Sequence, residues 1–357
     1  MLEIIVRRVL FPAFVFAGVV AHVPGFCGEI ENSSLLDKRQ ARTFSFYFEN
    51  DLFTGSDRHY TNGVKFTWIS PDLDAFTEYG ILPERWLSYI DYLPFVNKPG
   101  FQRNVAFFIG QNMYTPEEIE RAALLADDRP YAGWTYAGVS FHSKNRRRLD
   151  TEELQAGIVG QASLAEPVQK FVHRAVNVPE PRGWDHQLRN EPGLAIIFER
   201  KLRLFSTESA DGWGVDGIPF AGLSLGNIQT YANAGFELRL GLRLPRDFGS
   251  SLIRPAGDTS APAAQDDPRL ADLRSFGWHL FGTANGRMVV RDIFLDGNTF
   301  RDSHSVDKKT FVLDLAAGLC ITAGRFKVTY AYAVRTKEFK AQRRHDTFGA
   351  VSVSFTY

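Results

Sequence analysis

The sequence has few of the residues that would mark several common classes of protein. Two cysteines in 357 residues are too few for a disulfide scaffold or a cysteine-rich metal site. Lys plus Arg and Asp plus Glu both number 41, so the chain lacks the net positive charge of a typical nucleic-acid-binding protein. It also lacks the P-loop, G-x-G-x-x-G, H-E-x-x-H and C-x-x-C motifs, which leaves nucleotide, dinucleotide and zinc-hydrolase chemistry without support.

A long apolar run is also missing from the main part of the chain. Arg7 and Arg8 precede an apolar run at 9–21, which is shorter than the about 20 residues of a membrane-spanning helix. A basic start, a short apolar centre and small residues at 25–28 are typical of a secretory signal. We therefore predict a signal peptide at 1–28, a linker at 29–42 and one domain at 43–357.

Aromatic residues and glycine are abundant, and the apolar residues of the predicted domain recur with period two. The chain has 30 Phe, 12 Tyr and 30 Gly. Phe44, Phe46 and Phe48 alternate with more polar residues, and residues 235–244 alternate in the same way. This pattern indicates β-strands with one apolar face. A soluble β-sandwich would alternate too, but the signal, the aromatic content and the terminal Tyr357 favour an outer-membrane barrel.

Counting the alternating segments gives an all-β fold, a twelve-stranded antiparallel transmembrane β-barrel. The strand at 276–294 is kept as one, because a hairpin at Asn285-Gly286 would give an odd number of strands. The barrel does not explain residues 245–274, a connection longer than the usual periplasmic turns. The predicted strands are 43–50, 60–70, 104–111, 133–142, 152–160, 192–203, 218–227, 233–244, 276–294, 309–320, 325–335 and 346–357.

Polar residues gather where the first two predicted strands meet the outer rim. Asn50 ends the first strand, Asp51 follows it in the turn, and Thr61 lies where the chain turns back. Carboxylate and amide oxygens at this density suit a hard cation such as Ca²⁺. The alternative is a solvated turn that is rich in turn-forming residues.

A short helix is predicted at 163–176, in the loop between the fifth and sixth strands. Ser163 and Glu166 match a capping box, and Pro167 suits the first turn. Gln169 and His173 are four residues apart and so share one face. A neutral His is a natural general base, although a structural His is the simpler interpretation.

One motif is rejected. Residues 222–226 match the G-x-S-x-G pattern of serine hydrolases, with Ser224 at its centre. That pattern needs a turn from a strand into a helix, and here it lies inside an alternating strand.

Several separated motifs together resemble the outer-membrane lipid A 3′-O-deacylase family over about residues 43–357. They are Asn50-Asp51, 60–63, 110–116, 128–134, Gln169-x-x-x-His173, 183–188 and 296–298. The resemblance implies a twelve-stranded barrel and Ca²⁺-dependent hydrolysis of the ester that carries the 3′ acyloxyacyl chain, without an acyl-enzyme. It implies an outer-membrane location with the active site facing the outer leaflet.

The resemblance also implies roles for individual residues. His173 would be the base that activates water, and Gln169 would position the substrate or orient His173. Asn50 and Asp51 would build the cation and oxyanion region, with Asp51 as a metal ligand. Thr61 would lie beside the scissile carbonyl. The basic residue that the family uses near the third strand has no counterpart among 111–116.

The expected partners follow from this interpretation. They are lipid A or lipopolysaccharide as substrate, the outer-membrane lipids and the barrel assembly machinery, with no nucleic acid. Surface arginines at 129, 174, 182 and 189 could contact lipid A phosphates or be ordinary surface charges. The alternatives are an outer-membrane phospholipase that uses a Ser–His pair, a non-catalytic pore or adhesion barrel, and a family member that has lost activity.

Overall fold

The computed structural model describes residues 36–51, 59–76, 100–250, 252–271 and 273–357. The predicted signal peptide lies outside these ranges, so its cleavage stays a prediction. The predicted linker contacts the chain near residue 270, where the amide of Leu36 donates to the carbonyl of Leu270 at 3.0 Å.

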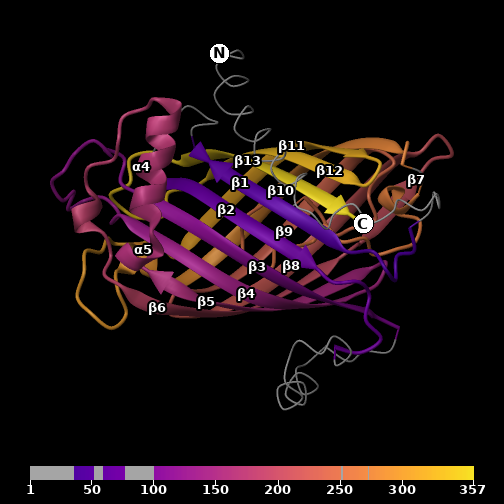
Figure 1. The fold of residues 1–357 in the computed structure, drawn as a ribbon, viewed down its shortest axis with the longest axis horizontal. Coiled ribbons are helices and arrows are strands. Elements are labelled where there is room, and N and C mark those ends of the chain that lie inside the picture. Colours follow the sequence, from indigo (N-terminus) through magenta and orange to yellow (C-terminus); the bar gives the residue numbers. More distant parts are fainter. Residues whose placement is uncertain (1–35, 52–58, 77–99, 251, 272) are drawn as a thin grey trace, which may run out of the picture.

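Antiparallel strands form one continuous sheet that closes on itself (Figure 1). The first and last strands, β1 and β13, pair with each other, and the closure is completed where β6 pairs with β8. The strands are β1 (Thr43–Asn50), β2 (His59–Ile69), β3 (Gln102–Thr115), β4 (Ala132–Lys144), β5 (Arg148–Val159), β6 (Glu191–Leu202), β7 (Phe205–Glu208), β8 (Trp213–Gly226), β9 (Gln229–Leu242), β10 (Phe276–Asp292), β11 (Phe311–Ala323), β12 (Phe326–Arg335) and β13 (Asp346–Thr356).

The predicted twelve-stranded antiparallel barrel is confirmed. The additional β7 has four residues and, among the described strands, pairs only with β8, at the end of the barrel away from helix α4 (Ala165–Val176), so it takes no part in the closure. Asn285 and Gly286 pair with β9 on one side and β11 on the other, so β10 is one strand as predicted. Ser224 lies inside β8 with its hydroxyl donating to the carbonyl of Gln229, which confirms that the G-x-S-x-G match is coincidental.

The barrel places polar side chains inside and apolar side chains outside. Along β9, Leu238 and Leu240 are exposed, whereas Glu237 and Arg239 are buried in the lumen. An outward apolar band with a polar interior is the arrangement that a transmembrane barrel requires, because lipid cannot hydrate polar groups. Among the described residues, no helix has the length and apolarity needed to cross a membrane.

The predicted helix exists, but its start differs from the prediction. Helix α4 (Ala165–Val176) begins after a 3₁₀ turn, η4 (Gln161–Ser163), and its N-cap is Leu164 in the left-handed region. The capping box is therefore wrong, because Ser163 belongs to the preceding turn and Glu166 forms an ion pair with Lys170 instead. The other short helices are η5 (Trp184–His186), η6 (Pro268–Leu270) and α5 (Ile293–Asp296).

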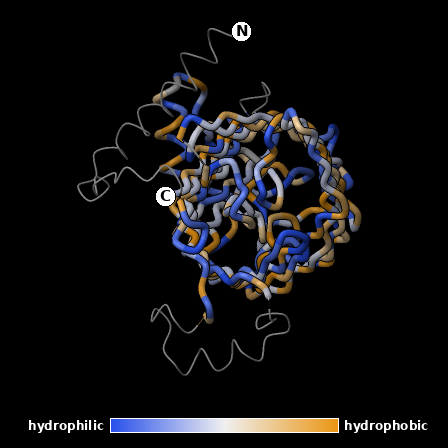
Figure 2. Tube along the Cα trace, turned by 90° about the vertical axis from the view of Figure 1, so that its right-hand side faces the viewer, coloured by the Kyte–Doolittle hydropathy of each residue, from blue (hydrophilic) through white to orange (hydrophobic). Residues whose placement is uncertain are grey.

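The long connection between β9 and β10 folds back into the lumen and forms a plug. Figure 2 shows chain inside the ring of strands. Residues 247–258 contact inward-facing residues of five wall strands, which is why this segment is not an extended periplasmic loop. The contacts are Asp258 with Lys65 and Thr67, Ser250 with Glu237, the amide of Ile253 with Glu49, the amide of Ala256 with Glu153, and Asp247 with Arg239 and Lys327.

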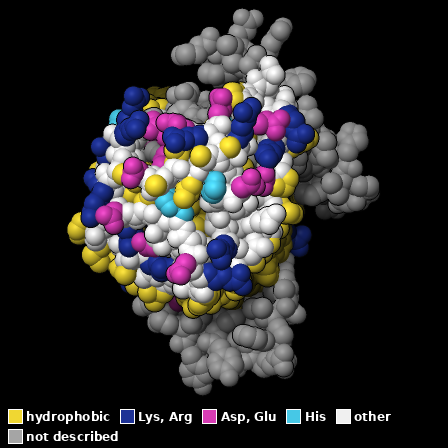
Figure 3. Space-filling model, turned by 90° about the vertical axis from the view of Figure 1, so that its left-hand side faces the viewer, with side chains coloured by type: hydrophobic (Ala, Val, Ile, Leu, Met, Phe, Trp, Pro, Cys, Tyr) yellow, Lys and Arg dark blue, Asp and Glu magenta, His cyan; other side chains and the backbone are white. Residues whose placement is uncertain are grey.

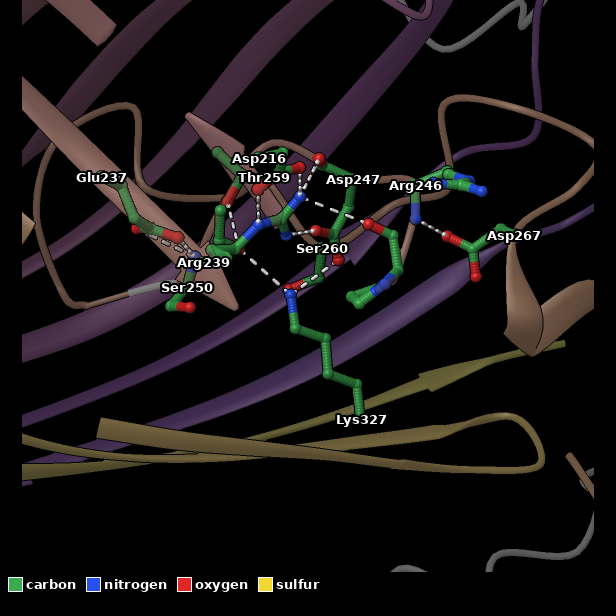
Figure 4. A network of polar contacts seen from close by, with 12 residues as sticks. Asp216, Glu237, Arg239, Arg246, Asp247, Ser250, Thr259, Ser260, Asp267 and Lys327 are labelled. Carbon is green, nitrogen blue, oxygen red and sulfur yellow. Dashed lines mark hydrogen bonds and ion pairs between the residues drawn. The ribbon is translucent and has the colours of Figure 1, made fainter. Parts of the chain in front are cut away.

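Asp247 is the centre of an ion network that fixes the plug (Figure 4). Its carboxylate lies 2.6 Å from Lys327 Nζ, 2.7 Å from Arg239 Nη1 and 3.2 Å from Arg269 Nη2. Burial alone would raise the pKa of this carboxyl, but the three cations, Lys327 first, outweigh burial and hold the pKa well below its usual range. The plug is therefore anchored by a carboxylate that stays charged.

Candidate active site

Helix α4 is held against the barrel wall at the rim by one close approach and one apolar cluster. At Gly133 in β4, a Cβ would lie 2.1 Å from Ser163 Oγ and 2.3 Å from Ala165 Cβ, so only glycine lets the helix start approach this closely. Ala165 then packs with Met113 of β3, Tyr131 and Trp184. The wall thus determines where the helix presents its polar face.

His173 lies near the end of α4 and is buried, with 2% of its surface exposed. Its Nδ1 is 2.6 Å from the carbonyl oxygen of Pro179, in the loop that follows the helix. Because a carbonyl can only accept, Nδ1 carries the hydrogen, and in the neutral ring Nε2 has the lone pair. This tautomer is the one that a general base acting through Nε2 requires.

Gln169 lies one turn before His173 and is equally buried. Its Oε1 accepts a hydrogen bond from Trp184 Nε1 at 2.8 Å. The indole N–H is only a donor, so it fixes the orientation of the amide and turns the NH₂ group the other way. Nε2 of Gln169 is buried and has no hydrogen-bond partner among the described residues. A buried donor without a partner is costly, so this N–H group is free to donate to an oxygen that approaches it.

Asn50 and Asp51 lie together at the end of β1, and both side chains are buried. In the sheet, Asn50 is opposite Asn62 of β2, and Asn62 is opposite Met113 of β3. Met113 belongs to the cluster under α4. The two predicted groups therefore approach the rim from different elements, Gln169 and His173 from the helix and Asn50 and Asp51 from the wall.

Thr61 lies in β2 at an irregularity of the pairing with β3, where the register shifts between Tyr60 and Asn62. Bulges of this kind are frequent next to active sites because they redirect side chains. The side chain of Thr61 is outside the described part of the structure.

The oxygens at the end of β1 are suited to a hard cation. Asp51 offers a carboxylate and Asn50 a carboxamide, and the buried Oδ1 of Asn62 has no hydrogen-bond partner among the described residues. Such oxygens are the ligands that Ca²⁺ prefers. Within the described ranges, no group of three or more His, Cys, Asp and Glu residues could hold a metal. Among the described residues, the oxygens beside Asp51 that could join it at a cation are those of amides and of the backbone.

One of the predicted roles for the rim needs revision. Arg129 is not a surface arginine that could reach a phosphate, because it is buried and pairs with Glu338 at 3.0 Å. Arg182 and Arg189 are exposed, as predicted. Sequence reasoning also missed the positioning contacts of Trp184 and Pro179. The only sequence signal for these contacts is that residues 179–184 follow the helix closely in the chain.

Comparisons with known proteins agree with this architecture. The family model described as outer membrane protein LpxR matches residues 10–357. The solved structure of LpxR from Salmonella typhimurium is similar with a TM-score of 0.68 and 17% identity, covering 88% of this chain and 99% of that one. The β domain of the Bordetella autotransporter BrkA has a TM-score of only 0.39 and 9% identity, covering 89% and 97%. No curated protein matches significantly. The chain therefore belongs to the LpxR family of outer-membrane β-barrel proteins.

Proposed function

We propose that this protein is a lipid A 3′-O-deacylase, which hydrolyses the ester that links the 3′ acyloxyacyl chain to lipid A. The family supports an outer-membrane protein of this kind. The observation that carries the proposal is the pair on α4. His173 has a defined tautomer, and Gln169 has a buried N–H donor with no partner in the described part of the chain. A base and an oxyanion donor on one helix face are the groups that ester hydrolysis needs.

In the proposed mechanism, Nε2 of His173 accepts a proton from a water molecule as the water attacks the ester carbonyl. The Pro179 carbonyl holds the opposite edge of the ring, so the imidazole keeps its orientation as it becomes charged. The NH₂ group of Gln169 donates to the carbonyl oxygen as negative charge develops there. The protonated imidazole then returns the proton to the leaving alkoxide, and no covalent enzyme intermediate forms.

The end of β1 would complete the site. Asp51, with Asn50 and Asn62, would hold a Ca²⁺ ion, which when bound supplies positive charge close to the developing oxyanion. Thr61 would lie on the same side, beside the scissile carbonyl. With the α4 rim facing outward, the site meets the outer leaflet, where lipid A is found.

The direct test is the mass of lipid A from cells that express the full chain. We expect a species that lacks one acyloxyacyl chain, and the same cells with His173→Ala should show unmodified lipid A. Purified protein in detergent should require Ca²⁺ and should leave phospholipids intact. Unchanged lipid A despite a folded barrel would contradict the proposal and support a non-catalytic barrel, whereas release of phospholipid acyl chains would support the phospholipase alternative.

Trp184→Phe tests whether the indole N–H orients Gln169. The change removes the donor to Gln169 Oε1 while it keeps an aromatic side chain in the buried cluster. The amide can then turn, so we expect kcat to fall about tenfold, in line with the loss of about one hydrogen bond to the site, with little change in KM. Trp134→Phe, at another buried indole in β4, is the matched control. Equal rates for the two variants would show that Trp184 only packs.

A further inference from the structure

A groove crosses the lipid-facing side of β9, β10 and β11, close to the rim that carries α4. It has a volume of about 750 Å³, and apolar side chains predominate in its lining. The groove lies on the far side of the barrel from α4, because β2, β1, β13, β12 and β11 separate β10 from β3 in the sheet order. It is therefore separate from the candidate active site.

The floor of the groove is formed by small residues and its walls by large ones. Gly286 of β10 lies between Ala234 of β9 and Leu313 of β11 in the register. One pair nearer the rim, Met288 lies opposite Phe311, and their exposed fractions are 45% and 73%. A flexible acyl chain fits a groove of this shape on the lipid-facing surface. A folded protein partner would have to displace lipid to reach it.

The rim end of the groove is basic. Lys309, just before β11, and Lys337, just after β12, both line it. Neither lysine forms an ion pair among the described residues, whereas Lys308 pairs with Asp296 and Lys340 with Asp307. Figure 3 shows Lys and Arg side chains interspersed with Asp and Glu over this end of the molecule. Two lysines that have no acidic partner within the described ranges, next to an apolar groove, complement an amphiphile with an anionic head.

We infer that this groove is a second lipid site, which binds a phosphate-bearing acylated lipid of the outer leaflet. One acyl chain would lie over Gly286, and a head-group phosphate would contact Lys309 and Lys337. The inference rests on the proposed function only for the orientation of the rim toward the outer leaflet. Such a site would keep a lipid A molecule beside the barrel without placing its ester near His173.

Two glycines of β10 have enough open space above them to serve as a test position and its control. A Cβ at Gly286 would come no closer than 3.7 Å to any atom, and a Cβ at Gly282 would meet nothing within 4 Å. Leucine therefore fits at both positions. Gly286→Leu fills the groove, whereas Gly282→Leu adds the same side chain to the same face of β10 at a position that does not line the groove. Lys340→Ala is the control for the double variant Lys309→Ala with Lys337→Ala.

The experiment is native mass spectrometry of the full-length protein titrated with bisphosphorylated lipid A, dephosphorylated lipid A or phosphatidylethanolamine. Every protein carries His173→Ala, so the probe is not hydrolysed. We expect Gly286→Leu and the double lysine variant to weaken one bisphosphorylated lipid A binding event about tenfold, and both controls to keep it. The lysine effect should vanish with dephosphorylated lipid A.

Equal binding by Gly286→Leu and Gly282→Leu would overturn the inference, as would equal retention of all three lipids by the wild-type groove. The proposed function is judged separately. With His173 intact, Gly286→Leu should still hydrolyse detergent-dispersed lipid A at the wild-type rate. Loss of groove binding with hydrolysis intact therefore supports the second site, and absence of hydrolysis in every variant refutes the catalytic proposal alone.

Discussion

Replacing His173 with alanine is expected to lower the rate of lipid A ester hydrolysis by about 10²–10⁴-fold, the range typical for loss of a general base. The reason is that no other group on this face of α4 has the required chemistry. Gln169 is an amide and cannot take a proton from water at neutral pH. The rate should be measured with purified protein in detergent, at saturating substrate and Ca²⁺.

The control for this loss is His186→Ala. His186 is exposed in η5, two residues from Trp184, so the change alters a histidine at the same rim without touching the Pro179 contact. A folded His173→Ala protein with the wild-type rate would show that the base lies elsewhere.

The barrel could be predicted from the sequence because each strand carries its own signal. In β1, apolar and more polar residues alternate: Phe44, Phe46 and Phe48 lie on one face, and Ser45, Tyr47 and Glu49 on the other. This alternation indicates which face contacts lipid, and it can be recognised from residues that are adjacent in the sequence. The even number of strands then decided how to treat Asn285-Gly286. The four-residue β7 was missed because it is an extension of the β8 hairpin, outside the barrel closure.

The plug could not be predicted because its partners are remote in the sequence. Residues 245–274 contain prolines and charged residues and look like a solvated loop. Asp258 reaches Lys65 in β2, 193 positions away, and Asp247 reaches Lys327 in β12, 80 positions away. Only closure of the barrel brings these charges together, so no local pattern records the pairing.

Part of the candidate site could be predicted from the sequence, because it depends on residues that are close together in the chain. The spacing of Gln169 and His173 is a local property of the helix, and it was predicted. The contacts that give these side chains their chemistry come from Trp184 and Pro179, which return to the helix through a turn of irregular backbone. The sequence therefore predicts which groups are candidates for the reaction, but it does not predict the contacts that set their hydrogen-bond polarity.

The plug fills the lumen with paired charges, which argues against the alternative that this barrel is a pore. Asp247→Ala should release the plug from the lumen. The change leaves Arg239, Lys327 and Arg269 buried beside one another without their shared carboxylate, a situation that typically costs about 3–5 kcal/mol. The strand pairing does not depend on Asp247, so the barrel should persist while the plug leaves the lumen.

This prediction can be checked by conductance in planar bilayers and by thermal unfolding. We expect the wild-type barrel to be closed and Asp247→Ala to conduct, with a lower Tm. Asp266→Ala is the matched control, because the Asp266 side chain is 45% exposed and pairs with Arg146 and Arg246 at the surface. Conductance equal to that of wild type, with an unchanged Tm, would show that other contacts hold the plug.

The pH dependence of the plug follows from the direction of the same pKa shift. Burial raises the pKa of Asp247, but Lys327, Arg269 and Arg239 lower it further, so the folded value lies below the about 3.9 of an unfolded Asp. The stabilisation is complete above that unfolded value and is lost only as the pH falls toward the folded value. The wild-type barrel should therefore stay closed in mild acid and begin to conduct only below about pH 3.9. A barrel that opens between pH 5 and pH 7 would mean that a different titrating group controls the plug.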